Sequence, residues 1–146
     1  MKKFFSMLVI GSVLTLLVAG TMRAQEPGTV IRASIPFDFI VRGRTLPAGK
    51  YEITRISDEP VGLLIRSLDD KRDKAVFETE PVYMRKLARN DELVFHRYGE
   101  SYFLSEVVTG GEQTAQQLKP SPAEREMRRE MAKNQEQPET VTVALN

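Results

Sequence analysis

The sequence predicts a mainly β protein: a small antiparallel barrel or sandwich of about seven strands, followed by one C-terminal α-helix. Three observations support this fold class. Between Val30 and Val108, apolar and polar residues alternate in short runs, as in half-buried strands. Turn-forming residues separate these runs. From Thr109 the composition becomes Gly- and Gln-rich, and a helix start follows at Ser121.

The stretch from Ile31 to Ile56 carries the clearest hairpin signal. Two β-rich runs flank a segment dense in turn residues. Leu46-Pro47-Ala48-Gly49 suits a type I turn, because its proline presets φ and its glycine fits the fourth position. Arg42-Gly43 offers an earlier reversal, since glycine takes positive φ without strain. Either turn predicts a hairpin that lays Tyr51 and Ile53 beside Phe37, Phe39 and Val41.

Further strand segments follow this stretch. Val61 to Ser67 is one, and the charged run Asp69 to Lys74 after it is interpreted as a solvated hairpin tip. Ala75 to Lys86 is broken by Pro81, so two short strands or one kinked edge strand both fit.

A second clear hairpin comprises Leu93 to Tyr98 and Ser101 to Val108. Both of its strands are apolar on each face in places. Two partly buried faces favour a closed or wrapped sheet over an open one with a wet side.

The C-terminal segments are predicted to be accessories to the β domain. Ser121 can cap a helix, Pro122 suits its first position and Glu124 completes a capping box. Ala123, Met127 and Met131 form a narrow apolar stripe, interpreted as a face that docks onto the core, with a partner site as the alternative. Val141 to Leu145 fits either an added edge strand or a flexible end. The predicted divisions are a signal peptide (1–24), a β domain (25–109), a linker (110–119), the helix (120–133) and a flexible tail (134–146).

The N-terminus predicts export. Lys2-Lys3 precede an uncharged apolar run from Phe4 to Gly20, the pattern of a secretory signal peptide. Cleavage is placed after Ala24, with Gly20 as the alternative, and an uncleaved anchor is the competing interpretation. No cysteine follows to carry a lipid. The predicted location is therefore the periplasm or the outside of the cell, with no membrane span after cleavage.

Composition excludes several classes of function. The 146 residues contain no Cys and one His, so disulfides, thiolate chemistry and ordinary zinc sites are not expected. Beyond the first 24 residues, which hold three of the 21 basic side chains, 18 basic residues face 20 acidic ones. A chain without a basic excess has no electrostatic footprint for a phosphate backbone, so nucleic acid is not an expected partner.

Candidate chemistry is sparse. No phosphate loop, nucleophile elbow or zinc-protease motif occurs. His96 is interpreted as a core or interface histidine bonded to a neighbour. Carboxylates alone could serve a hydrolase, and six lie in strand-like segments: Asp38, Glu52, Glu78, Glu80, Glu92 and Glu106.

Aromatic and arginine residues around the second hairpin give a candidate binding surface, with cross-strand pairing as the alternative. These residues are Tyr83, Arg97, Tyr98 and Tyr102. No catalytic, metal-ligating or cofactor-binding residue is assigned, no cofactor is expected, and the ligand and oligomeric state stay open.

The segments IPFDFIVRGRTLPAGKYEI and LVFHRYGESYFLSEV, with the SPAERE helix start, resemble a group of small exported bacterial proteins of unknown function. The resemblance covers Ile31 to about Glu130. It implies an exported β-rich fold and brings no activity or site residues. The expected function is a non-catalytic binding or cell-envelope-associated protein, with an unknown protein or envelope component as partner; the alternative is a small carboxylate-based periplasmic hydrolase.

Overall fold

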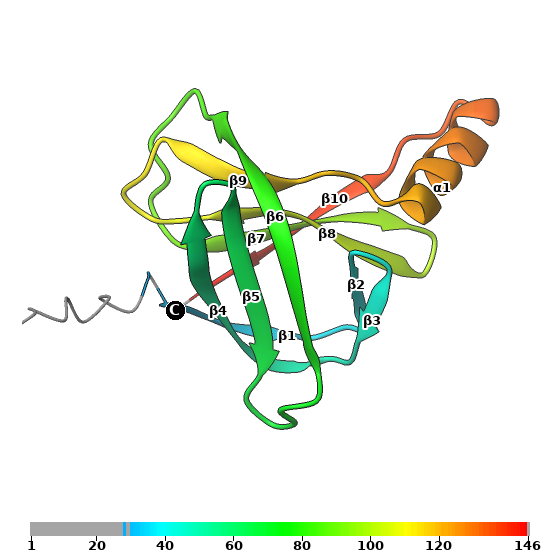
Figure 1. The fold of residues 1–146 in the computed structure, drawn as a ribbon. Helices are drawn as coiled ribbons and strands as arrows, with labels where there is room; N and C mark the ends of the chain where they lie inside the picture. Colours follow the sequence, from blue (N-terminus) through cyan, green and yellow to red (C-terminus); the bar gives the residue numbers. More distant parts are fainter. Residues whose placement is uncertain (1–27, 29, 146) are drawn as a thin grey trace, which may run out of the picture.

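The computed structural model describes residue 28 and residues 30–145 (Figure 1). The predicted signal peptide lies outside this range. Within it, no helix is long and apolar enough to cross a membrane.

The described chain is mainly β with one helix, as predicted. The elements run in the order β1 (Val30–Ile35), β2 (Phe39–Val41), β3 (Arg44–Leu46), β4 (Gly49–Asp58), β5 (Val61–Ser67), β6 (Lys74–Tyr83), β7 (Glu92–Tyr98), β8 (Ser101–Val108), β9 (Thr114–Leu118), α1 (Pro122–Lys133) and β10 (Glu139–Ala144). All ten strands belong to one mixed sheet, in which β2 and β8 pair in parallel and the other pairs are antiparallel.

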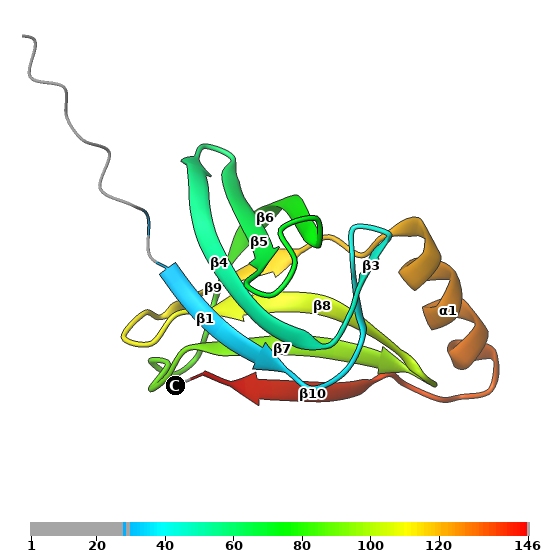
Figure 2. The ribbon, with the colours of Figure 1, turned by 90° about the horizontal axis from the view of Figure 1, so that it is seen from below.

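The sheet is open, so the predicted closed barrel is wrong, and its ten strands replace the expected seven. The order is β1-β4-β5-β6-β9-β8-β2-β3, with β7 on β8 and β10 on β7. The sheet curves until β1 and β10 lie alongside each other (Figure 2), but no described pairing joins them. The extra strands come from segments whose sequences signal turns, a linker and a tail.

The core follows the predicted alternation. In β1, Ile31, Ala33 and Ile35 are buried between exposed neighbours, and the long strands continue this pattern. Phe39 and Phe95 are fully buried, with their ring centroids 5.6 Å apart. Inward-facing side chains of the curved sheet therefore form one continuous core.

The predicted pairing of the central hairpin is wrong. The chain reverses twice, at Arg42-Gly43 and again between β3 and β4, so β2 pairs with β3 while β4 returns to pair with β1. A hydrogen bond of 2.8 Å from the Ala48 amide to Asp38 Oδ1 holds the second reversal. The expected side-chain contact persists without strand pairing, because the Phe39 and Tyr51 rings meet edge to face at 5.1 Å.

The predicted linker and tail also differ from the structure. Thr114–Leu118 of the expected linker forms β9, which pairs with both β6 and β8. Glu139–Ala144 of the expected tail forms β10 on β7, and Leu145 after it is buried. The strand alternative for Val141 to Leu145 is therefore the one observed. Both segments gain their structure from pairing with distant strands, which a local pattern does not report.

The helix begins where predicted but docks differently. Ser121 Oγ accepts a hydrogen bond of 3.2 Å from the Glu124 amide. Ala123 and Met127 of the apolar stripe are exposed, so the predicted docking through that stripe is wrong. The buried residue of α1 is Glu124, whose carboxylate turns toward β7.

Candidate functional site

The sheet contains a gap between the β2–β3 hairpin and the first half of β6. Strand β9 pairs with β6 only from Thr79 to Tyr83. Before Thr79, β6 is paired with β5 on one side, and no described strand pairs with its other side. Strand β3, which is paired only with β2, lies across this gap, and Figures 1 and 2 both place the hairpin beside β6.

The outer surface over this gap is a hollow of about 540 Å³. It is lined by Val41, Arg42, Arg44, Leu64, Arg66, Lys74, Ala75 and Val76. The four charged lining residues, Arg42, Arg44, Arg66 and Lys74, are all cationic, and we call the hollow with these four residues the basic seam. Its wall is apolar, since Leu64 and Val76 face each other across β5 and β6.

Arg42 reaches the seam from a turn in which its backbone adopts an unfavourable, left-handed conformation. Val41 pairs with Arg44, so Arg42 and Gly43 form a two-residue hairpin loop with φ angles of 52° and 82°. Positive φ at both positions is the geometry for which Asn-Gly and Gly-Gly are preferred. An arginine in this left-handed conformation costs about 1–2 kcal/mol. The turn therefore carries a guanidinium at a position where a smaller residue would be more stable.

Most of the seam's positive charge has no carboxylate partner within the described chain. Arg66 is the exception: its Nη2 lies 3.1 Å from Glu52 Oε1. Arg44 Nη2 donates to the Arg72 carbonyl at 3.0 Å. No described carboxylate lies within 4.0 Å of the charged nitrogens of Arg42, Arg44 or Lys74.

The surroundings of the seam contain paired charges. Lys119 lies 2.6 Å from Glu80, and this hydrogen bond raises the pKa of Lys119. The nearby Arg42 charge opposes that rise. The contrast between compensated charges around the seam and uncompensated charges within it makes the seam a candidate site for anions.

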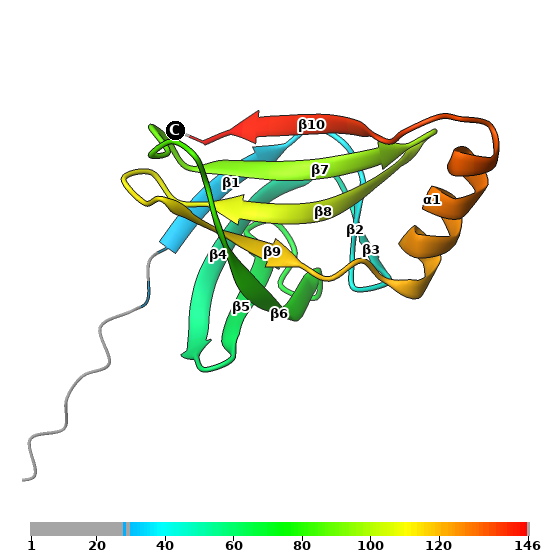
Figure 3. The ribbon, with the colours of Figure 1, turned by 90° about the horizontal axis from the view of Figure 1, so that it is seen from above.

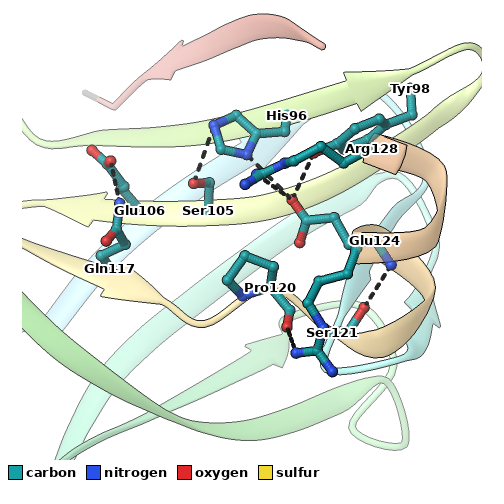
Figure 4. Close-up of polar contacts among 10 residues, drawn as sticks. His96, Tyr98, Ser105, Glu106, Gln117, Pro120, Ser121, Glu124 and Arg128 are labelled. Atoms are coloured by element: carbon teal, nitrogen blue, oxygen red, sulfur yellow. Dashed lines mark hydrogen bonds and ion pairs between the residues drawn. The ribbon is translucent and has the colours of Figure 1, made fainter. Parts of the chain in front are cut away.

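A second polar cluster joins α1 to β7 and β8 (Figure 4). Tyr98 Oη donates to Glu124 Oε1 at 3.2 Å, and His96 Nδ1 lies 3.2 Å from the same oxygen. Arg128 Nη2 is 3.7 Å from Glu124 Oε1, and Arg128 Nε donates to Tyr98 Oη at 3.2 Å. Burial, the largest cause, raises the pKa of Tyr98, and the hydrogen bond from Arg128 opposes it. We call these four residues the helix clasp.

His96 and Glu124 of the helix clasp, together with Ser105 on β8, have the order of a catalytic triad but lack the access that catalysis needs. Ser105 Oγ is 3.4 Å from His96 Nε2, which gives the order serine, histidine, glutamate. However, Ser105 is only 5% exposed, and Glu124 is equally buried. A nucleophile must reach its substrate. The geometry therefore assigns His96 to a polar contact between α1 and the sheet.

The six carboxylates named from the sequence are only partly brought together: Glu80 and Glu106 both pair with Gln117 of β9, and Glu78 lies two residues before Glu80 on the same face. Asp38 holds the second reversal, Glu52 lies between Arg32 and Arg66, and Glu80 pairs with Lys119. Glu106 accepts from Gln117 on the neighbouring strand. Glu78 is exposed on β6, and Glu92 is half-buried on β7. None of the six carboxylates lines the basic seam.

The candidate aromatic surface is also divided. Tyr102 stacks on Phe37 with ring centroids 3.9 Å apart, and Arg97 lies 5.4 Å from the Tyr102 ring on the adjacent strand. Tyr98 is buried in the helix clasp, and Tyr83 stands 84% exposed on β6. Cross-strand pairing describes Arg97 and Tyr102 better than a common binding surface does.

Sequence reasoning missed the residues of the basic seam. Its cations come from β2–β3, β5 and β6, so only the topology places them together (Figure 3). One local signal was available, because Arg42-Gly43-Arg44 combines a tight turn with two cations. Comparison with family models, with curated proteins and with solved structures finds no match to this chain.

Proposed function

We propose that this chain is an exported, non-catalytic binding protein that takes an anionic ligand at the basic seam. Export rests on the signal-peptide pattern of Lys2-Lys3 and the apolar run Phe4 to Gly20. The mature protein then acts in the periplasm or outside the cell, where its partner is a protein or an envelope component. In this role the curved sheet serves as a sandwich-like scaffold whose outer face carries the site.

The observation that carries the proposal is the uncompensated charge of Arg42, Arg44 and Lys74 around one hollow. Proteins ordinarily intersperse charges of both signs on their surfaces. In the basic seam, charges of one sign are concentrated, and one of them, Arg42, lies in a turn with an unfavourable backbone conformation. A ligand that neutralises them recovers favourable Coulomb energy that the isolated chain lacks.

The ligand must be multivalent. An exposed ion pair contributes about 0.2–1 kcal/mol, so pairing the three uncompensated cations supplies about 0.6–3 kcal/mol. A dissociation constant of 1 mM already requires about 4 kcal/mol. Simple anions would therefore bind weakly, and a ligand that also contacts the apolar wall of Leu64 and Val76 would bind more tightly.

Calorimetry on the mature chain tests the proposal, with inorganic polyphosphate and oligo-aspartate as probes. We expect binding that weakens as salt rises, because exposed charges are screened. The double substitution Arg44→Ala with Lys74→Ala should weaken binding at least tenfold. Arg85→Ala is the matched control, since Arg85 is an exposed arginine beyond the other end of β6. Equal losses from the seam and control variants would show non-specific attraction and refute the proposed site.

A further inference from the structure

The basic seam lies between two strand edges that lack partners. The outer edge of β3, Arg44–Leu46, is not paired with any described strand. The same holds for β6 from Lys74 to Glu78 on the side away from β5. Unpaired strand edges present rows of backbone N–H and C=O groups that can accept another chain.

We propose that the ligand of the basic seam is an extended acidic peptide segment of a partner protein, which binds by adding a strand at this gap. The inference rests on the proposed function and specifies its ligand class. Main-chain hydrogen bonds to the edges of β3 and β6 would supply affinity, and alternate side chains would supply specificity.

The dimensions limit the length of the segment. Strand β3 offers three residues, and the free stretch of β6 offers the five from Lys74 to Glu78. At about 3.3 Å per residue, a segment of four residues spans about 13 Å. The bound segment is therefore a short strand of about four or five residues.

Charge defines its sequence pattern. Successive side chains of a strand point to opposite faces, so every second residue of the segment faces outward. At one end of the gap those outward residues meet Arg44 and Lys74. Exposed Glu78 lies at the other end of the free stretch and disfavours acidic groups there. The preferred segment carries acidic residues at the outward positions near Arg44 and Lys74 and a neutral residue near Glu78. The residues between them are apolar or β-branched and face inward, toward Val41 and Ala75.

Charged residues on an exposed edge have a competing explanation. Lysine and arginine on edge strands prevent unwanted pairing between sheets. If the cations only prevent pairing between sheets, they should attract acidic peptides equally whether or not the peptide amides are free to donate hydrogen bonds. Backbone chemistry therefore separates strand addition from simple electrostatic attraction.

The test compares three peptides of identical side-chain sequence, Asp-Val-Asp-Val-Thr, labelled with fluorescein. One is unmodified; the other two carry N-methyl groups on alternate amides, one on the odd and one on the even positions. Fluorescence polarisation with the mature chain measures binding. We expect each methylated peptide to bind at least tenfold more weakly than the unmodified one. Arg44→Ala with Lys74→Ala should weaken the unmodified peptide at least tenfold, while Arg85→Ala should leave it within twofold.

Amide hydrogen exchange supplies an independent readout. Bound peptide should slow exchange in β3 and in Lys74–Glu78, and leave β10 unchanged. If all three peptides bind within twofold of one another, strand addition is wrong and the anion site stands. If neither the peptides nor inorganic polyphosphate bind, the proposed function fails together with this inference.

Discussion

The helix clasp and the basic seam each bring together charged residues that are distant in the sequence, but they differ in how completely those charges are satisfied. In the helix clasp, Glu124 is buried and receives the Tyr98 hydroxyl and the His96 ring, with Arg128 close by. In the basic seam, Arg42, Arg44 and Lys74 are exposed and have no described carboxylate within ion-pair distance. The clasp has the properties of a structural contact between helix and sheet, whereas the seam has the properties expected of the anion site that we propose.

The largest effect is expected from removing everything after Lys119, which deletes α1, β10 and the clasp together. The deletion exposes the outer edge of β7 and removes Val141, Val143 and Leu145 from the core. Burying an aliphatic side chain contributes about 1.5–3 kcal/mol, so about 3–6 kcal/mol is lost when partial burial is considered. Native domains have only about 5–15 kcal/mol in total. Urea denaturation should show an unfolded or severely destabilised chain.

A smaller truncation after Leu145 is the control for that experiment, since it removes only Asn146. If the chain that ends at Lys119 unfolds at the same urea concentration as the full chain, the clasp and β10 contribute nothing to the stability of the β domain. The helix clasp would then not be a structural contact, and its contrast with the basic seam would not hold.

Glu124→Ala should have an intermediate effect on stability. Tyr98 Oη would lose its acceptor in a buried position, and leaving a buried polar group unsatisfied costs about 1–3 kcal/mol. Equilibrium unfolding in urea measures the loss. Glu126→Ala, on the exposed side of the same helix, should change stability by less than about 0.5 kcal/mol. Anion binding should be unaffected by either substitution, and a loss of binding in Glu124→Ala would couple the two regions.

Arg42→Asn should have the smallest effect on stability, and in the opposite direction. Asparagine tolerates the left-handed conformation, so the free energy of unfolding should rise by up to about 1 kcal/mol. Anion binding should fall two- to fivefold, because an ion pair of about 0.5–1 kcal/mol is removed. Thermal denaturation and calorimetry measure the two quantities on the same sample.

Gln135→Asn is the matched control for Arg42→Asn. Gln135 is the other described non-glycine residue with positive φ, at 58°, and it lies after α1. It should gain similar stability without any change in anion binding. If Arg42→Asn stabilises the chain and leaves binding intact, the strained arginine has no part in the site.

The sequence predicted the parts of the fold that depend on local patterns. Alternation located the buried residues of the long strands, and Ser121 with Pro122 located the start of α1. It failed at β9, whose sequence TAQQL has no clear alternation and contains a buried glutamine. Gln116 is accommodated because its side-chain oxygen accepts a hydrogen bond of 2.9 Å from Thr79 on β6.

The candidate site could not be predicted from the sequence, because its residues come together only through pairing between distant strands. Arg42 and Arg44 lie on the β2–β3 hairpin, while Arg66 lies on a strand reached after two further reversals of the chain and Lys74 on one reached after three. Their proximity depends on where β9 stops pairing with β6, and no residue pattern within one strand encodes that end point. Glu124 shows the converse case, since its capping-box position was recognised while its actual partners on β7 were not.

The position of β10 in the sheet also has a consequence for the order of folding. Strand β7 has β8 on one side and obtains its other neighbour only from residues 139–144, more than 40 positions later in the chain. Pairings between such distant segments require the closure of long loops, which slows folding. During synthesis, the sheet cannot be completed until β10 has emerged, which requires almost all of the described chain. For the export that we propose, this interval would leave time for the chain to cross a membrane before its sheet is complete.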